Sequence, residues 1–243
     1  MKTYSYSHRP AGMGRIALVA WCCLLLSVSL FGGQGKEKGD LDRVLAQMES
    51  VGKGFKTFAA KFSQKKYTAV LKEFDTPETG EFYYARARDG SAMLRQDATS
   101  PGRRILTIKG GTATIYQPDI RQAQIANLGQ NKDKAEYLAL GIGQSPAKLQ
   151  ETFHISYQGS ETLNGAPCSV LLFKPRNAKA AAMFSSITLW VKKSSGIPIQ
   201  QKLQEPSGDY LLVSFFEEKL NTKIPDSRFE QKLPSGVDIQ RIQ

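Results

Sequence analysis

The sequence predicts a mainly β protein of the α+β class, in which one antiparallel sheet curls into a half-open barrel. Short segments of alternating apolar and polar residues recur along most of the chain, and Gly, Pro, Asp or Ser bound each of them. These strands follow one another without the strand–helix alternation of parallel α/β proteins. A sheet of this size curls. An N-terminal helix and a central helical lid are then available to cover an apolar cavity on its concave face.

The first 35 residues are expected to be a cleaved secretory signal. Lys2, Arg9 and Arg15 precede an apolar run over residues 16–31. That run is shorter than the about 20 apolar residues that a membrane-spanning helix needs. Small residues follow it, as they do in cleaved signals. An uncleaved membrane anchor is the alternative, and residues 36–243 would form the folded domain.

Cysteine content and charge narrow the function class. Cys22 and Cys23 lie inside the apolar run, and Trp21 before them does not suit a lipoprotein signal, so Cys168 alone is expected in the exported chain. One cysteine excludes an internal disulfide, and Cys168 is expected to be a small apolar strand residue. Without the signal, 30 of the 33 Lys and Arg remain against 22 Asp and Glu, a net charge of +8. In an exported protein this charge favours an anionic membrane or an acidic protein over nucleic acid, and a solvated basic surface is the alternative.

An amphipathic helix is predicted after a polar linker at residues 34–39. Asp40 would cap its start, and Gly52 and Gly54 would end it. Its apolar residues recur at three- and four-residue spacing and form one face, namely Leu41, Val44, Leu45, Met48 and Val51.

Strand patterns follow the helix. Phe58, Ala60 and Phe62 alternate with more polar residues, and Phe82, Tyr84 and Arg86 share one face of the next strand. Further strands are expected at residues 92–97, 103–109, 112–117, 122–128, 153–159, 168–174, 187–193, 197–204 and 209–218, with a last short strand or two in the tail over 228–242.

The segment 130–152 interrupts the strands and is predicted to form the lid from two helical pieces. Ser145 and Pro146 would begin the second piece, because proline suits the first turn of a helix. Gly141 and Gly143 would make the join between the pieces easy to move. The first piece would present one apolar face made of Ala135, Leu138, Ala139 and Ile142.

No catalytic or metal-binding constellation accompanies these elements. The exported chain would hold one histidine, His154, on the solvent face of a strand. One histidine and one cysteine cannot supply the clustered ligands that zinc needs. Neither a nucleophile elbow nor a phosphate-binding loop occurs. Glu217 and Glu218 are expected to end a strand in water. We therefore predict no enzyme, no cofactor and no metal.

With its elements in order, the chain resembles the LolA family of periplasmic outer-membrane lipoprotein carriers over most of residues 40–240. Each motif is weak alone, and their order and spacing carry the resemblance. In chain order they are Phe62-Ser63-Gln64, Gly80-Glu81-Phe82 followed by Arg86, Leu94-Arg95, Pro101, Gly110-Gly111, Tyr116-Gln117-Pro118, Gln122-Ala123, Leu189-Trp190-Val191, Gly196-Ile197-Pro198, and Phe229 before Pro234-Ser235-Gly236.

The resemblance implies a carrier that receives lipoprotein acyl chains from an inner-membrane exporter and passes them to an outer-membrane acceptor. We expect this carrier to be a monomer. The resemblance also implies that Arg86 hydrogen-bonds backbone carbonyls of the lid and holds the lid shut. Two departures bear on this latch, because Ala87 replaces a usual proline and Gln96 stands near a usual tryptophan. A related half-barrel that senses lipid or envelope stress is the alternative, whereas an acceptor would need a lipid-bearing cysteine.

The strand faces and the resemblance together predict an apolar ligand site for acyl chains, with no role for nucleic acid. Its expected lining is Phe62, Phe82, Tyr84, Arg86, Leu94, Leu106, Ile115, Leu138, Ile142 and Trp190.

Overall fold

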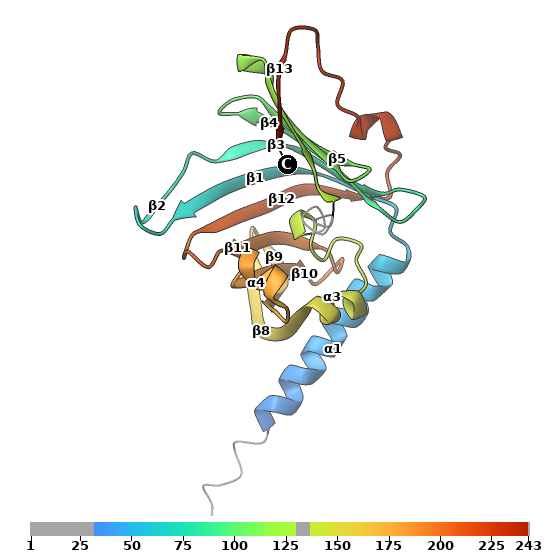
Figure 1. The fold of residues 1–243 in the computed structure, drawn as a ribbon. Helices are drawn as coiled ribbons and strands as arrows, with labels where there is room; N and C mark the ends of the chain where they lie inside the picture. The colour runs from blue at the N-terminus through green and yellow to red at the C-terminus, as the bar shows by residue number, and fades with distance from the viewer. Residues whose placement is uncertain (1–31, 130–136, 243) are drawn as a thin grey trace, which may run out of the picture. The chain divides into compact units, whose positions relative to one another are not determined.

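The computed structural model describes residues 32–129 and 137–242, with side chains from Glu37 onward. The chain divides into two units, Met1–Lys36 and Glu37–Gln243, and the sheet belongs to the second (Figure 1). The helices are α1 (Gly32–Lys53), α3 (Pro146–Thr152) and α4 (Ala178–Met183), with 3-10 turns η1 (Pro118–Ile120) and η3 (Asp226–Phe229). The strands are β1 (Thr57–Thr68), β2 (Glu73–Phe74), β3 (Glu78–Arg86), β4 (Ala92–Ser100), β5 (Arg104–Lys109), β6 (Thr112–Gln117), β7 (Gln122–Asn127), β8 (Phe153–Leu163), β9 (Ala166–Pro175), β10 (Ser186–Lys192), β11 (Pro198–Gln204), β12 (Tyr210–Leu220) and β13 (Asp238–Ile242).

All the strands of the described residues belong to one 13-stranded sheet, in the order β13-β7-β6-β5-β4-β3-β1-β12-β11-β10-β9-β8, with β2 beside β1. Strand β1 pairs with both β3 and β12 and so joins the two halves of the sheet. The sheet curls without closing, because β8 and β13 stay at its ends (Figure 1). The predicted fold class is confirmed. One pair departs from the expected antiparallel meander, because the tail strand β13 runs parallel to β7.

Alternation on β1 places one face of the sheet in the core. Phe58, Ala60 and Phe62 are buried, whereas Lys61 between them is exposed. The ring centroid of Phe58 lies 6.1 Å from that of Phe82 on β3 and 5.6 Å from that of Phe215 on β12. Phe82 and Phe215 are 5.0 Å apart. This aromatic triangle ties the two halves of the sheet together on its concave side.

Helix α1 covers part of the concave face, but it begins earlier than predicted. Val44, Leu45 and Met48 join the core cluster as expected. The predicted linker is helical, because the helix starts at Gly32. Asp40 is therefore not a cap, and its carboxylate instead pairs with Arg43 at 2.9 Å. The lysines and glutamate of this stretch favour helix enough to extend it past the glycines. The predicted end is confirmed, because α1 stops at Lys53.

The second helical piece of the lid is confirmed as α3, which begins at Pro146. Ser145 stands at the N-cap position but makes no capping bond, because its hydroxyl donates to Glu49 Oε2 at 2.9 Å. The prediction for the first helical piece of the lid is wrong in part. Ala135 lies outside the described residues, and the chain is helical at 137–138 but turns from 139 onward. Leu138, Ala139 and Ile142 therefore do not share a helical face.

A short helix that the sequence did not suggest, α4, lies between β9 and β10. Asn177 caps it, because its side-chain oxygen accepts a hydrogen bond from the backbone N–H of Ala180. The alanine-rich stretch favours helix, but a helix of 6 residues is too short to show a periodic apolar face.

Replacing Phe58 with alanine should lower the free energy of unfolding by about 3–5 kcal/mol, because the change leaves a cavity between β3 and β12. Chemical denaturation would measure it. Ile120→Ala is the matched control, since Ile120 is 58% exposed and its loss should cost within about 0.5 kcal/mol. Equal effects of the two changes would show that the aromatic triangle does not join the halves.

Candidate functional site

The candidate site is the apolar concave face beneath residues 137–152, which are the described part of the predicted lid and are called the lid segment below. Tyr137, Ala139, Leu140, Ile142 and Leu149 of the lid segment belong to the same core cluster as the inward side chains of the sheet. Tyr137 also makes edge-to-face ring contacts with Phe153 and Phe184, at 6.0 Å and 5.5 Å. The lid segment thus packs as a cover on the concave face.

The predicted lining residues fall into three groups. The largest group lies in the core cluster and is buried: Phe62, Phe82, Tyr84, Leu94, Leu106 and Ile142. Ile115 and Leu138 are partly buried and pack against that cluster. Arg86 lies half-buried at the end of β3 and reaches the lid segment. Their common role in binding a ligand stays a prediction.

Trp190 is the exception and is removed from the candidate site. Its neighbours Leu189 and Val191 are fully buried, so the pleat directs Trp190 to the opposite face of β10. There its indole N–H donates to Glu161 Oε2 at 2.7 Å. The strand is apolar on both faces at this point, and periodicity in the sequence could not decide which face is inward.

Two side chains of the sheet hold the backbone of the lid segment. Arg86 Nη2 donates to Gly143 O at 3.3 Å, and its Nη1 donates to Gly90 O at 3.4 Å. Gln201 on β11 is fully buried, and its Nε2 donates to Leu140 O at 3.1 Å. These bonds satisfy two carbonyls of a turn that leaves regular helix, so they specify where the lid segment rests.

The two glycines of the lid segment are required by close packing. Gly141 has φ +77° and Gly143 has φ +61°, a region that other residues rarely adopt. A Cβ on Gly143 would overlap the ring of Phe55, and one on Gly141 would lie 2.9 Å from Leu189 Cδ1. The predicted ease of movement at this join stays a prediction, because in this arrangement both glycines are tightly packed.

The described side chains of the concave face pack closely. Its aromatic and aliphatic side chains contact one another, α1 and the lid segment. A cavity of about 130 Å³ lies at the edge of the lid segment, lined by Leu140, Leu149 and Phe153 among others. Pockets for small ligands usually measure about 300–1,000 Å³. The cavity at the edge of the lid segment is therefore smaller than such pockets.

A polar cluster occupies the opposite end of β3 from Arg86. Gln64 Nε2 donates to Glu78 Oε2 at 2.5 Å, and Gln96 Nε2 donates to Gln64 Oε1 at 2.8 Å. Arg104 donates to both oxygens of Glu78, with 3.1 Å between Nε and Oε1. Burial disfavours the charged carboxylate, yet the hydrogen bonds and charge of Arg104 outweigh it and lower the pKa of Glu78. The apolar face therefore lies between a polar end and the Arg86 end.

The histidine and the cysteine considered for chemistry lie on the neighbouring strands β8 and β9. His154 is exposed on β8, as predicted. Cys168 is buried in β9, and burial raises the pKa of its thiol, as expected for a packed strand residue. Within the described ranges, no group of three His, Cys, Asp or Glu side chains is placed to hold a metal ion. The same ranges contain no helix both long and apolar enough to cross a bilayer.

The sequence profile of the family described as "Outer membrane lipoprotein carrier protein LolA" matches residues 53–232. The chain belongs to the LolA family. A protein of Chromobacterium violaceum named outer-membrane lipoprotein carrier protein is 27% identical over 198 residues, 80% of this chain and 86% of that one. A protein of the same name from Pseudomonas syringae pv. tomato is 25% identical over 227 residues, 93% and 99% of the two chains.

Solved structures agree with the fold of this LolA-family chain. An uncharacterized conserved protein from Thermus thermophilus superimposes with a TM-score of 0.52 at 12% identity, over 84% of this chain and 99% of that one. This likeness concerns the fold alone. The family resemblance predicted from the order of weak motifs is confirmed.

Gln201 is the site residue of this LolA-family chain that sequence reasoning missed. It lies between Ile199 and Leu203 at the inward positions of β11, all three of them buried. A polar residue among the apolar inward residues of a strand could have indicated this site, because a buried amide needs a hydrogen-bond partner. The partner, a carbonyl of the lid segment, lies 61 residues away in sequence and could not be predicted.

Gln201→Leu should destabilise the protein by about 1–3 kcal/mol, because the carbonyl of Leu140 would stay buried without its donor. Denaturation curves and limited proteolysis within residues 137–152 would measure the effect. Gln200→Leu is the matched control, because Gln200 lies half-buried on the opposite face and bonds Ser214 at 2.9 Å, where water can replace it. If proteolysis of the lid segment is the same in both variants, Gln201 does not hold it.

Glu78→Gln should change how stability depends on pH. The folded-state pKa of Glu78 lies below its usual value of 4.5. The carboxylate therefore stabilises the fold above pH 4.5, and that contribution is lost as the pH falls below 4.5 through the folded-state value. Urea midpoints measured from neutral to acid pH should fall less steeply below about pH 5 for the variant than for the wild type. Parallel curves would show that Arg104 does not stabilise the charged form.

Proposed function

We propose that this LolA-family protein is a non-enzymatic carrier that binds the acyl chains of lipoproteins beneath the lid segment. The observation that carries the proposal is an apolar concave face, rich in aromatic side chains, covered by a short segment whose turn is bonded to the sheet at Gly143 and Leu140. The names of its relatives support lipoproteins as the cargo class. The carrier would move its cargo through the periplasm, from an inner-membrane exporter to an outer-membrane acceptor.

The energetics of such a carrier follow from the closed arrangement. An empty concave face would expose large aromatic surfaces, at about 25 cal/mol for each Å² of apolar area. Leu140 and Ile142 of the lid segment remove that exposure when no cargo is bound. An acyl chain gains about 0.8 kcal/mol per buried methylene but must displace these side chains first. The cost of displacing the lid side chains offsets part of this gain, so the affinity for the acyl chain should be moderate. A moderate affinity suits a protein that must also release its cargo.

Arg86 is proposed as the latch of the closed state. Its guanidinium links Gly143 of the lid segment and Gly90 of the β3–β4 turn, and both acceptors are backbone carbonyls. Opening the lid segment breaks the first of these bonds. A ligand shifts the balance between closed and open states only by its different affinity for them. The strength of the Arg86 bonds therefore sets how readily cargo enters and leaves.

Location and assembly complete the proposal. The basic and apolar N-terminal stretch supports a cleaved signal over residues 1–35, a carrier domain over 36–243 and a periplasmic location. Residues 1–31 lie outside the described part of the chain. We expect a monomer, because a carrier must present its lid segment to two different membrane proteins in turn.

Acyl binding is tested by calorimetry with single-chain lipids of increasing length. Binding should strengthen by about 0.8 kcal/mol for each methylene and show a negative heat-capacity change. Mass spectrometry of material that co-purifies from the envelope would identify the cargo. Lipoproteins are expected, whereas free lipids alone would favour the sensor interpretation. No binding and no heat-capacity change would contradict the proposal.

Arg86→Leu should leave the fold intact and change cargo retention. A charge-assisted hydrogen bond contributes roughly 1.5–3 kcal/mol, so the transfer equilibrium should move by about one to two decades. Transfer of an acylated lipoprotein to acceptor-containing membranes would measure it. The control is Arg88→Leu, an exposed arginine two positions further along the chain. Wild-type transfer by the Arg86 variant would mean that the latch assignment is wrong.

A further inference from the structure

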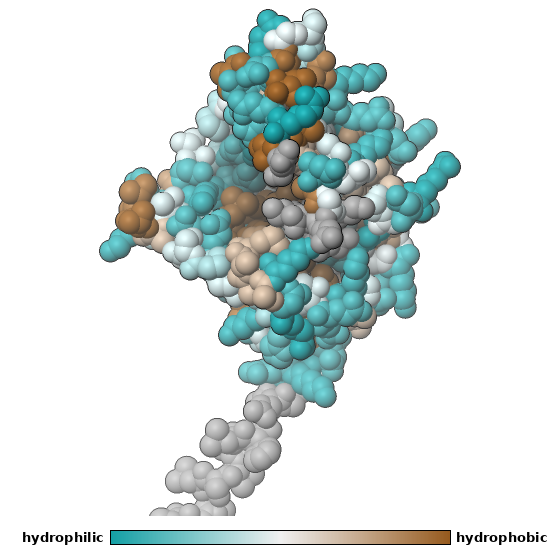
Figure 2. All heavy atoms as spheres, viewed as in Figure 1, coloured by the Kyte–Doolittle hydropathy of each residue, from teal (hydrophilic) through white to brown (hydrophobic). Residues whose placement is uncertain are grey.

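The end of the β1–β2 hairpin exposes two neighbouring aliphatic side chains to solvent. Val70 is 86% exposed and Leu71 is 63% exposed, more than any other large apolar side chain that the structure describes. Residues 67–75 are called the hairpin tip below. In Figure 2 an apolar patch projects from the molecular surface at the position of this hairpin. Leaving two neighbouring aliphatic side chains in water is unfavourable, which suggests a contact made elsewhere in the protein's cycle.

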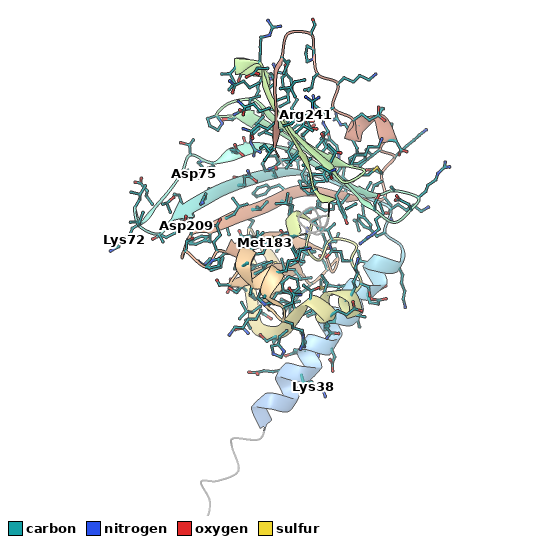
Figure 3. All side chains as sticks on the ribbon, viewed as in Figure 1. Lys38, Lys72, Asp75, Met183, Asp209 and Arg241 are labelled. Atoms are coloured by element: carbon teal, nitrogen blue, oxygen red, sulfur yellow. The ribbon has the colours of Figure 1, made fainter. Side chains whose placement is uncertain are left out.

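The hairpin tip is an ordered structure, so the exposure does not come from a loose loop. The backbone N–H of Ala69 donates to Asp209 Oδ1 at 2.9 Å, and that of Lys72 donates to Thr68 O at 2.8 Å. The N–H of Lys66 donates to Asp75 Oδ1 at 2.6 Å. Figure 3 shows Lys72 at the far end of the hairpin, with Asp75 and Asp209 behind it. These bonds hold Val70 and Leu71 outward.

A collar of aromatic rings and lysines lies behind the two aliphatic residues. The ring centroids of Tyr67, Phe74 and Tyr210 are 4.8 to 5.6 Å apart. Lys65 Nζ lies 4.0 Å from the centroid of Phe74, and Lys202 Nζ lies 4.0 Å from that of Tyr210. Aliphatic side chains backed by tyrosines and lysines are typical of segments that enter the interface of a bilayer.

The size of the patch favours a bilayer over a protein. A stable protein interface takes about 20–30 residues on each side, whereas this patch consists of Val70, Leu71 and the edge of Phe74. Acidic residues balance the lysines near the tip, because Lys66 pairs with Glu205 and Asp209. Insertion would therefore rest on the apolar side chains. The net charge of +8 that remains without residues 1–35 would draw the exported chain toward anionic lipid.

We propose that the hairpin tip inserts Val70 and Leu71 into the interfacial layer of an anionic bilayer. The tip extends β1 beyond Gln64, which pairs with Glu78 at the polar end of the concave face. Insertion would therefore bring that end of the sheet, rather than the Arg86 end, to the membrane. The proposal holds whether or not lipoproteins are the cargo, because it depends only on the hairpin.

The test places an environment-sensitive fluorophore on Lys72→Cys in the exported chain, residues 36–243, in which the buried Cys168 is kept. Protein-free vesicles of phosphatidylethanolamine and phosphatidylglycerol should shift its emission to the blue, and quenchers carried on the lipids should reach it. Val70→Asp combined with Leu71→Asp should weaken this response by at least about tenfold.

The matched control is Ile120→Asp, because Ile120 is 58% exposed but lies away from the hairpin tip in η1. It should leave the fluorophore's response unchanged, and circular dichroism would confirm that all variants fold. Three results would overturn the proposal. They are a fluorophore that stays in water on vesicles that bind the chain, an equal response from the double variant, and a response seen only when the membranes contain envelope proteins, which would indicate a protein partner.

Discussion

The central strand β1 pairs with both β3 and β12. It makes one continuous sheet from the two halves of the chain, and Phe58 lies at the joint with Phe82 and Phe215. A curled sheet that does not close leaves its concave face open. That face carries most of the large apolar side chains, so it must be covered by something other than the sheet.

The cover is built from two unequal parts. Helix α1 supplies a regular apolar face, whereas the lid segment is a turn that needs buried donors and two glycines to fit. A helix satisfies its own backbone, but a turn depends on Gln201 and Arg86 for its carbonyls. We therefore expect the lid segment, rather than α1, to open at the lower free-energy cost, and the proposed carrier function depends on this difference.

The two ends of the concave face carry different polar side chains. At one end, Arg86 makes a hydrogen bond to the lid segment at Gly143 O. Glu78 and Arg104 give the other end a charged and hydrogen-bonded surface, next to the hairpin tip. A carrier that exchanges cargo at membranes needs one closed state and one way of approaching a membrane. In the proposed carrier these two features would lie at opposite ends of β3.

Much of the fold could be predicted, because alternation on strands is a local property. The strand faces of β1 and β3 and the buried lining from Phe62 to Leu106 followed from it. Features that depend on contacts between residues distant in sequence could not be predicted. The parallel placement of β13, the outward position of Trp190 and the bond between Gln201 and Leu140 each depend on partners far away in sequence. The short helix α4 has too few residues to show a periodic apolar pattern in the sequence.

Hydrogen exchange of the lid segment, with and without a single-chain lipid, tests whether the lid segment opens to admit an acyl chain. Backbone amides of the lid segment should exchange faster than those of β1 and β12, because opening the lid costs less than breaking the sheet. A bound acyl chain should increase exchange in the lid segment further while leaving the strands protected. Equal protection of lid segment and sheet, unchanged by lipid, would show that the lid segment is ordinary core and would contradict the proposed carrier function.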